Sequence, residues 1–208
     1  MTDKSHWEQV YQSKASDAVS WYQPHAQMSL EMIREIAGSG RAALIDVGAG
    51  ASNLVDDVLT QGLAEVTVLD ISATALALVQ RRLGERANKV RWIEADVTQA
   101  SLPSLAYDIW HDRAVFHFLI DASDRQAYLA QVGRALKPGG HLLLATFAHD
   151  GPQKCSGLPV MRYSAQGLQA VFGPSFKLLS QRHEEHHTPA GTVQSFMYAH
   201  LQHLPSQP

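Results

Sequence analysis

Four carboxylates occupy comparable places along the chain, each at the end of a short apolar run or directly after it. They are Asp46, Asp70, Asp96 and Asp112. The apolar runs have the length and composition of buried strands, and the segments between them have helical spacing. Strands that alternate with helices form a parallel sheet, which binds ligands beyond the carboxyl ends of its strands. Four carboxylates in register therefore predict a polar ligand that lies across the strand tips.

A glycine-containing turn follows the first of these strands, in the sequence LIDVGAGASNLV at 44–55. Gly48 and Gly50 can adopt positive φ angles, which suit either a turn that holds a nucleotide or an ordinary tight connection. The glycine pair alone leaves both interpretations open. Ser52 can cap the helix that follows, because apolar residues recur there with helical spacing.

The rest of the chain supplies the elements that must position these residues. We expect strands at 42–50, 65–70, 90–96, 107–115 and 141–148, and helices at 24–39, 52–63, 72–87 and 121–136. The sequence KPGG predicts the end of the last of these helices. After residue 148 the alternation stops, and a short helix at 165–173 precedes two strand-like segments at 176–189 and 192–204. Their β-branched and aromatic residues predict a C-terminal hairpin.

Composition limits the partners that the protein can have. The 208 residues are 45% hydrophobic, and 17 basic against 20 acidic side chains give a net charge of −3. This balance offers no basic surface for nucleic acid or for a membrane. Cys155 is the only cysteine, so no internal disulfide can form. No apolar run resembles a signal peptide or a membrane span, so we expect a cytoplasmic monomer with no membrane or nucleic-acid partner.

The order and spacing of the motifs resemble the class I S-adenosylmethionine-dependent methyltransferases over roughly residues 40–148. The acid and spaced glycines of that family are matched by Asp46, Gly48 and Gly50, with Ser52 in place of a third glycine. LKPGGHLLL at 136–144 matches the turn and strand that follow the family's fourth crossover helix. The resemblance implies one doubly wound α/β methyltransferase domain over 1–208. Its mostly parallel, seven-stranded, Rossmann-like sheet would end in an antiparallel C-terminal hairpin.

The resemblance also implies S-adenosylmethionine as the cofactor and assigns roles to individual residues. Asp70 falls where the family binds the ribose hydroxyls, and Asp96 with Val97 falls where it contacts the adenine. The cofactor-binding residues expected on this basis are Trp7, Tyr11, Trp21, Asp46, Gly48, Gly50, Asn53, Asp70, Ile71, Asp96, Val97, Asp112 and Arg113.

The segment HDRAVFHFL at 111–119 lies where the family places residues that face the transferred methyl group. The resemblance therefore makes His111, Asp112, Arg113 and His117 candidates for the substrate wall. An adjacent Asp–Arg pair is more often a structural ion pair. We predict His117 as the catalytic residue, since an imidazole with a pKa near neutrality can act as a general base. A structural histidine, in an enzyme that needs no base, is the alternative.

Four aromatic residues precede the helix expected at 24–39: Trp7, Tyr11, Trp21 and Tyr22. Trp7 and Tyr11 are four positions apart and would share one face of a helix. Aromatic rings favour a sulfonium ion through cation–π contact. We therefore predict that 1–23 is a lid that is poorly anchored without ligand. Simple packing of these rings onto the core is an equally supported interpretation.

Three other interpretations bear on these motifs. A dinucleotide-binding fold requires a third glycine three positions after Gly50, where the chain has Asn53. His183, His186 and His187, with Cys155 and His149, could in principle hold a metal, but their spacing has no zinc-site signature. We therefore predict no metal. A non-catalytic module that binds the cofactor or senses a metal is the third alternative.

The methyl acceptor is left open between a small molecule and a side chain of a partner protein. The arrangement HWEQVY…VSWY is loosely similar to methyltransferases that act on protein lysines, and to others that act on small thiols or metalloid oxyanions.

Overall fold

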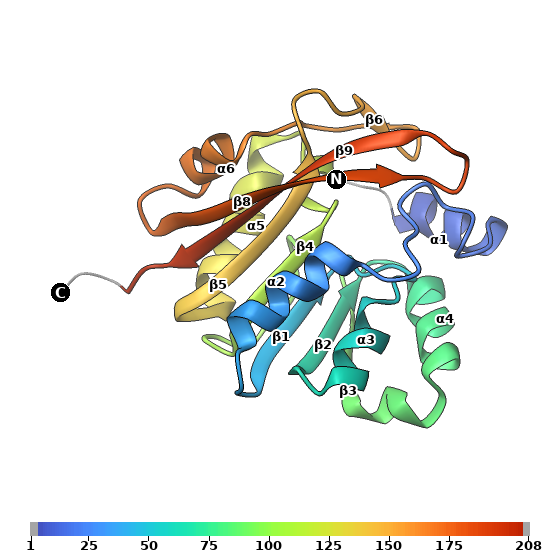
Figure 1. Ribbon diagram of the computed structural model, residues 1–208, viewed down its shortest axis with the longest axis horizontal. Helices are drawn as coiled ribbons and strands as arrows, with labels where there is room; N and C mark the ends of the chain where they lie inside the picture. Colours follow the sequence, from blue (N-terminus) through green and yellow to red (C-terminus); the bar gives the residue numbers. More distant parts are fainter. Residues whose placement is uncertain (1–3, 206–208) are drawn as a thin grey trace.

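A seven-stranded sheet forms the centre of the protein in the computed structural model, which describes residues 4–205 (Figure 1). Its strands are β1 (Ala42–Val47), β2 (Ala64–Asp70), β3 (Val90–Glu94), β4 (Tyr107–Arg113), β5 (Leu136–Phe147), β8 (Phe176–His187) and β9 (Val193–His203). Across the sheet the order is β3, β2, β1, β4, β5, β9, β8. The predicted domain and lid also include residues 1–3 and 206–208, which lie outside the described residues.

The strand directions confirm the predicted fold class. β1 pairs in parallel with β2 and β4, and β3 and β5 extend this parallel sheet outward on either side. β9 runs antiparallel to β5, and β8 runs antiparallel to β9. The sheet is therefore a mostly parallel, doubly wound α/β sheet that ends in an antiparallel C-terminal hairpin.

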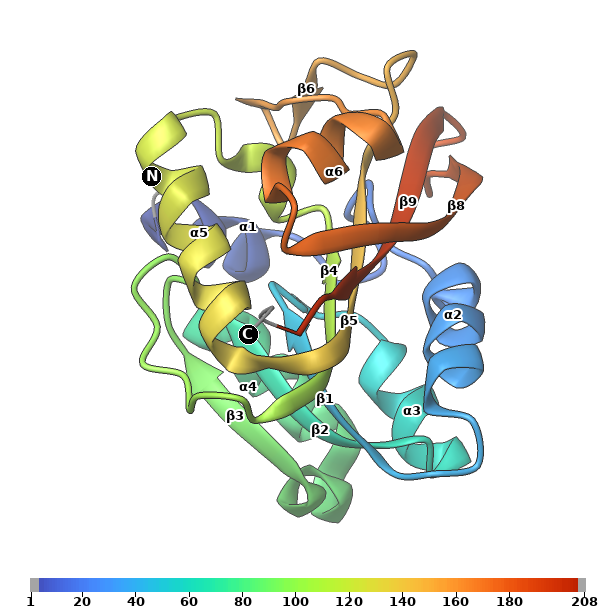
Figure 2. The same ribbon diagram turned by 90° about the vertical axis from the view of Figure 1, so that its left-hand side faces the viewer.

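Helices cover both faces of the sheet. They are α1 (Lys4–Ser13), α2 (Gln27–Ala37), α3 (Leu54–Gln61), α4 (Ala73–Leu83), α5 (Ala122–Ala135) and α6 (Ala165–Phe172). One apolar core joins α5 and α6 to the sheet, and a second joins α2, α3 and α4 to it. Figure 2 shows α5 and α2 on opposite sides of the sheet. No helix within residues 4–205 has both the length and the apolar character needed to cross a membrane.

Several elements differ from their predicted bounds. The helix predicted over 72–87 is α4, which ends at Leu83 because Gly84 has a φ of 59° and starts the 3-10 helix η1 (Gly84–Lys89). β5 begins at Leu136, so KPGG lies inside a strand, next to a register shift opposite β4. A small hairpin, β6 (Lys154–Cys155) and β7 (Leu158–Pro159), lies between residue 148 and the helix predicted at 165–173, where no strand was predicted.

The N-terminal helix α1 precedes the helix predicted as the first one, and it is docked against the domain. The Glu8 carboxylate accepts hydrogen bonds from the backbone N–H groups of Ala73 (2.7 Å) and Thr74 (3.2 Å), at the start of α4. These groups have no partner within their own helix, and a carboxylate there also suits the helix dipole. Lys4 pairs with Glu94. The described part of the predicted lid is therefore anchored in this structure.

Candidate functional site

A cleft lies at the carboxyl ends of β1 to β4, between the strand tips and α1. It encloses about 740 Å³ of empty space, including its opening to solvent. Its floor includes Val47, Asp70 and Arg113, each from the end of a different strand. The ligand site predicted at the strand tips therefore coincides with a cleft in the structure.

A second cavity adjoins the first on the side of α2. It contains about 550 Å³ of empty space and shares Trp21, Gly48 and Arg113 with the cleft. Asp46 and Gln23 also line it, and Gln23 Oε1 is buried with no hydrogen-bond partner among the described residues. A buried acceptor without a donor is costly, so this oxygen marks a place that suits a ligand with N–H or O–H groups.

Asp70 occupies the end of β2 and lines the cleft. Its Oδ2 accepts a hydrogen bond from the Gly50 N–H (2.7 Å), and its Oδ1 accepts one from the Ser72 N–H (2.8 Å). Burial raises the pKa of Asp70 to about 6, although both amide bonds oppose the shift. A carboxylate has about four lone-pair sites. Asp70 can therefore still accept hydrogen bonds from ligand hydroxyl groups.

Three more of the predicted residues line the cleft beside Asp70: Ile71, Asp96 and Val97. Asp96 is half-buried, and its Oδ1 accepts hydrogen bonds from the backbone N–H of Thr98 (2.8 Å) and its hydroxyl (2.7 Å). The tips of β2 and β3 thus present two carboxylates and two aliphatic side chains to one end of the cleft.

The glycine turn lies partly at the cavities and partly beneath α1, since Gly48 lines both cavities and Gly50 lies under Tyr11. Gly48 and Gly50 have φ angles of 60° and 56°, as expected for a tight turn. A Cβ on Gly48 would overlap the side chain of Val115, and a Cβ on Gly50 would overlap the hydroxyl of Tyr11. In this structure the absence of side chains allows α1 and the turn after β4 to approach the loop. Gly50 lies beneath Tyr11 and outside both cavities.

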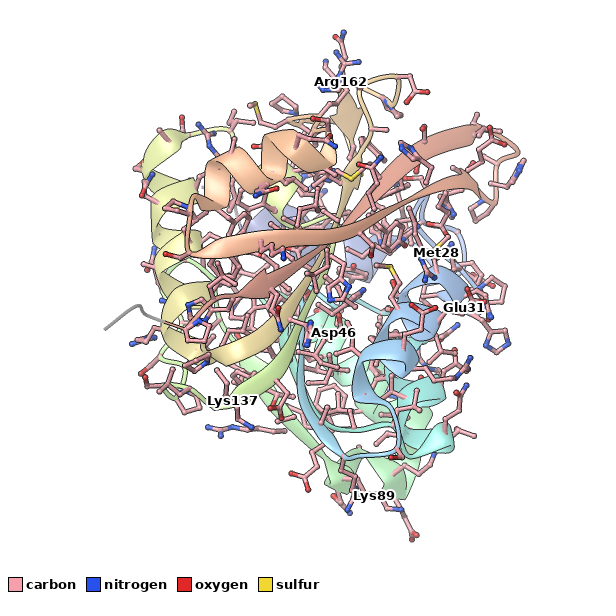
Figure 3. All side chains as sticks on the ribbon, turned by 60° about the vertical axis from the view of Figure 1, so that its left-hand side comes forward. Met28, Glu31, Asp46, Lys89, Lys137 and Arg162 are labelled. Atoms are coloured by element: carbon pink, nitrogen blue, oxygen red, sulfur yellow. The ribbon has the colours of Figure 1, made fainter. Side chains whose placement is uncertain are left out.

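Asp46 belongs to a buried hydrogen-bonded chain that links three elements. Its Oδ1 lies 2.7 Å from His111 Nδ1, and His111 Nε2 lies 2.8 Å from Ser29 Oγ on α2. Figure 3 shows Asp46 inside the molecule beside α2, which also carries the labelled Met28 and Glu31. Asp46 and His111 both line the second cavity, whereas Ser29 is fully buried.

Arg113 lines both cavities and is the cation at their junction. Its guanidinium donates to the Tyr198 hydroxyl (3.0 Å), the Trp21 carbonyl (3.2 Å) and Glu184 (3.4 Å). It also lies 4.4 Å from the centroid of the Phe196 ring. Burial opposes the charged form, but Tyr198 and Glu184 outweigh it and raise the pKa of Arg113. Its ion-pair partner is therefore Glu184 rather than its neighbour in sequence, Asp112.

Aromatic side chains form part of the wall of the cleft. Trp7 makes edge contacts with Trp21 and Phe118, at centroid distances of 5.8 and 5.2 Å, and Tyr11 lies 6.3 Å from Trp21. All four line the cleft. Tyr22 lines only the second cavity. The predicted aromatic lid residues thus face the ligand space, and Trp7 and Tyr11 also pack against the domain.

Besides Gly50, two more predicted cofactor-binding residues, Asp112 and Asn53, line neither cavity. Asp112 is fully buried, accepting hydrogen bonds from the Tyr128 hydroxyl (2.6 Å) and the Val115 N–H (2.8 Å), and burial raises its pKa to about 6. It stabilises the turn after β4. The Asn53 amide donates to the carbonyls of Gln23 (3.4 Å) and Pro24 (3.2 Å). Both side chains were wrongly placed because a residue at a strand or helix end can turn either way.

His117 also lies away from both cavities. Its ring is fully buried against Phe118 and Phe147, at centroid distances of 4.4 and 4.9 Å. Neither ring nitrogen has a hydrogen-bond partner among the described residues, and burial lowers the pKa of His117 to about 3. A neutral imidazole enclosed by phenylalanine rings cannot reach an acceptor in the cleft. The structure therefore argues against the predicted general base.

Two further residues of the site were not among the predicted cofactor-binding or catalytic residues, although Phe118 lies in the predicted substrate wall at 111–119. Cys155, in the β6–β7 hairpin, lines the cleft, and burial raises the pKa of its thiol to about 12. Phe118 completes the aromatic wall. Their positions depend on a short hairpin and a 3-10 turn, which no periodic pattern in the sequence predicts.

The histidine-rich strand does not form a metal site in the part of the chain that the structure describes. Within residues 4–205, no three His, Cys, Asp or Glu side chains are grouped closely enough to hold an ion. His186 Nε2 lies 2.7 Å from the Ser20 carbonyl and so ties β8 to the segment that precedes α2.

Comparisons with known proteins agree with this geometry. Residues 44–140 match a family of methyltransferase domains. The eEF1A lysine and N-terminal methyltransferase of Bos taurus is 23% identical over 149 residues, covering 69% of this chain but only 21% of that protein. An uncharacterized methyltransferase of Mycobacterium bovis is 32% identical over 108 residues, about half of each chain.

Solved structures share the whole fold. The N-methyltransferase NodS from Bradyrhizobium japonicum, solved with S-adenosylhomocysteine, has a TM-score of 0.71 at 13% identity and covers 95% of this chain and 98% of its own. A structure from work on the conversion of a disulfide into a thioacetal during echinomycin biosynthesis has a TM-score of 0.76 at 18% identity, covering 98% and 94%.

The strand order and the antiparallel hairpin define a Rossmann-like methyltransferase fold, with a ligand site at the expected strand tips. In both fold and sequence the chain is similar to the class I S-adenosylmethionine-dependent methyltransferases. S-adenosylmethionine is the cofactor of this family.

The two adjoining cavities suit this cofactor. Asp70 and Asp96 offer acceptors to hydroxyl and amino groups at one end of the cleft. The adjoining cavity is lined by Gln23, whose Oε1 has no partner among the described residues, and by Asp46, and these acceptors suit an ammonium group. Charge-assisted hydrogen bonds of this kind are the stronger ones.

Proposed function

We propose that this protein transfers the methyl group of S-adenosylmethionine to a small-molecule acceptor at the aromatic end of the cleft. One observation carries the proposal: two adjoining cavities at the strand tips combine adenosine-type acceptors, an unpartnered buried oxygen and an aromatic wall beneath one helix. When bound, the cofactor supplies an activated methyl group on a sulfonium sulfur.

The residues of the chain then bind, orient and exclude water. Asp70 accepts hydrogen bonds from ribose hydroxyls and Asp96 accepts one from the adenine amino group. Gln23 and Asp46 hold the ammonium of the methionine end. Trp7 and Trp21 keep water from the reacting atoms, which strengthens electrostatic interactions in the cleft.

A small acceptor is favoured over a protein side chain because the cleft is roofed. Glu8 fastens α1 to α4, and His6 Nε2 lies 3.2 Å from Ser156 Oγ in the β6–β7 hairpin. The relatives named above include protein methyltransferases, so a polypeptide acceptor is the second candidate. A polypeptide would require these roof contacts to open. We further propose a cytoplasmic monomer, in keeping with the reduced, buried Cys155 and the mild net charge of −3.

Two measurements test this proposal. Calorimetry should detect S-adenosylhomocysteine binding, and radiolabelled S-adenosylmethionine should yield label in a small organic-soluble product from cell extract. Label in a protein band would instead establish the polypeptide acceptor. Tight binding with no label on any acceptor would identify a non-catalytic cofactor-binding module, and preferential binding of NAD would contradict the proposal altogether.

A further inference from the structure

Glu184 lies on β8, in the C-terminal hairpin, and lines neither cavity. Its side chain is only 13% exposed. It nevertheless contacts two residues that do line the cavities. Its Oε1 accepts a hydrogen bond from Gln23 Nε2 (2.8 Å), and its Oε2 accepts one from the Arg113 guanidinium (3.4 Å). A carboxylate outside the ligand space is therefore bonded directly to residues that border it.

Two donors bind Glu184 Oε2, so this position requires an acceptor. A guanidinium only donates, and Arg113 Nε therefore donates to the Tyr198 hydroxyl oxygen (3.0 Å). The Tyr198 hydroxyl in turn donates its own proton to Glu184 Oε2 (3.0 Å), where Arg113 donates as well. Only an oxygen without a hydrogen can satisfy both donors at this place.

The other oxygen of the same carboxylate determines how the Gln23 amide is oriented. An ionised carboxylate only accepts hydrogen bonds, so the end of the amide that lies against Glu184 must be the NH2 group. The carbonyl oxygen of Gln23 is then its other polar end, and this atom is buried with no partner among the described residues. Gln23 lines the second cavity. The group that Gln23 can offer to a ligand there is therefore set by a residue on another element.

A glutamine at position 184 would have the same shape as the glutamate but would reverse this arrangement. Its carbonyl oxygen would take the place of Oε2, because Tyr198 and Arg113 both donate there. Its NH2 group would then lie against the NH2 group of Gln23. Two donors cannot bond to each other, so the Gln23 amide would turn over and accept a hydrogen bond from the new amide. Gln23 would then present N–H groups where it now has an oxygen.

We propose that Glu184 is a positioning residue that makes the site specific for the ammonium group of the cofactor, because it holds the Gln23 amide with the oxygen as the end that can accept; this inference rests on the proposed function. An ammonium has three donors and no acceptor. It can bond to a carbonyl oxygen, whereas N–H groups in the same place would leave both sides without a partner, which is costly in a buried site.

Two ligands that differ only in the amino group test this inference: S-adenosylhomocysteine and its desamino analogue, which keeps the carboxylate. Calorimetry on the full-length protein gives the ratio of their affinities. We expect the unaltered protein to prefer S-adenosylhomocysteine by at least about tenfold, the size of a hydrogen bond to a charged group. Glu184→Gln should lower this ratio about tenfold.

The ratio separates this role from other effects of the substitution. Any change in the way Arg113 attracts the carboxylate alters both affinities alike, and so does a general loosening of the fold. Glu185→Gln is the matched control, since it makes the same change at the next position, where the side chain is exposed. It should keep the ratio of the unaltered protein.

Two further variants show whether Glu184 acts through Gln23. Gln23→Met removes the amide, so adding Glu184→Gln to it should not lower the ratio further. Exchanging the pair, as Gln23→Glu with Glu184→Gln, again places a carboxylate against an NH2 group and leaves an oxygen for the ligand. This exchange should restore the preference for S-adenosylhomocysteine. If Glu184→Gln alone does not fold, the exchanged pair decides the question.

An unchanged ratio in folded Glu184→Gln would overturn the positioning role, and so would a low ratio in the exchanged pair. Equal affinities of the unaltered protein for the two ligands would overturn it as well, because no specificity for the ammonium would then exist. If the unaltered protein bound neither ligand, the result would instead contradict the proposed function, and this inference with it.

Discussion

The phenol oxygen of Tyr11 lies in the space that a side chain on Gly50 would occupy. Tyr11 belongs to the N-terminal helix and Gly50 to the turn after the first strand. With Tyr11 in this position, there is no room for a side chain at position 50. The glycine turn is thus a docking point for α1. A change in its backbone would alter the cofactor site by moving that helix.

Gly50→Ala should lower the free energy of unfolding by more than the cost of placing alanine at a positive φ angle, because the added Cβ would also overlap Tyr11. Gly62→Ala is the matched control, since Gly62 has a φ of 63° and no atom within 4 Å of an added Cβ. We expect Gly50→Ala to exceed this control by about 1–3 kcal/mol in denaturant unfolding, the usual cost of overpacking. In a Tyr11→Ala background the excess should shrink, as a double-mutant cycle would show. Equal losses at the two glycines would refute the docking role.

Asp70→Ala should weaken S-adenosylhomocysteine binding by roughly 1.5–3 kcal/mol, the range for hydrogen bonds to a charged group. Calorimetry on the folded variant measures this. Glu65→Ala, an exposed change at the opposite end of the same strand, should leave the affinity unchanged. An unaltered affinity in the Asp70 variant would contradict the assignment of the adenosine end.

The affinity for S-adenosylhomocysteine should also depend on pH. Hydroxyl groups donate to the ionised carboxylate, and the pKa of Asp70 in the free protein is about 6. Binding should therefore weaken as the pH falls through about 6 and reach a plateau above it. Because Asp70→Ala lacks the titrating group, its affinity should lose this dependence. A wild-type profile that stays flat between pH 5 and 7 would show that Asp70 does not make these bonds.

His117→Leu should preserve methyl transfer, because the imidazole does not reach the cleft. It should also flatten the pH dependence of stability. Burial in the folded protein lowers the pKa of His117 from its ordinary value of 6.5 to about 3, so between these pH values the unfolded state binds more protons. This group therefore lowers the free energy of unfolding by about 1.4 kcal/mol per pH unit below pH 6.5.

Thermal or denaturant unfolding of both proteins between pH 4 and 7 would measure that difference. His149→Leu, at an exposed position, is the control and should follow the unaltered protein. Loss of turnover in a folded His117→Leu variant would restore the general-base role.

Glu8→Ala should loosen α1. Loss of a helix-capping partner costs about 0.5–2 kcal/mol, and the effect falls on the docking of one helix. Limited proteolysis after Lys14 should accelerate, and S-adenosylhomocysteine should slow it again. Gln9→Ala, at an exposed neighbouring position, should behave like the unaltered protein. Unchanged cleavage in the Glu8 variant would show that the cap does not hold the helix.

The sheet and the strand-tip site could be read from the sequence because both depend on local periodicity. Apolar runs followed by carboxylates led to Asp70 and Asp96, which both line the cleft. The same pattern led to Asp112, which is fully buried. The turn after β4 could not be read in this way. Ala114 has a φ of 75°, so the chain leaves the alternation of the strand there. For this reason Arg113 faces the cavities while His117 faces the core.

Residues that meet across long sequence separations were also beyond prediction. The sequence suggested a lid, but nothing in it showed that Glu8 would find the start of α4 or that Cys155 would border the cleft. Such contacts depend on tertiary packing, which overrides local pattern.

The bonds from Glu8 to Ala73 and Thr74 have a practical consequence for anyone who shortens this protein. The Glu8 side chain, 65 residues earlier in the chain than Ala73, accepts a hydrogen bond that the first turn of α4 cannot make internally. Removing the first turns of the chain would strip α4 of that support and uncover the aromatic wall at the same time. Any loss of activity in a shortened protein would therefore combine two effects, fraying of α4 and the loss of α1 above the cleft. Point changes at Glu8, with α1 left in place, are the cleaner way to ask what the helix does.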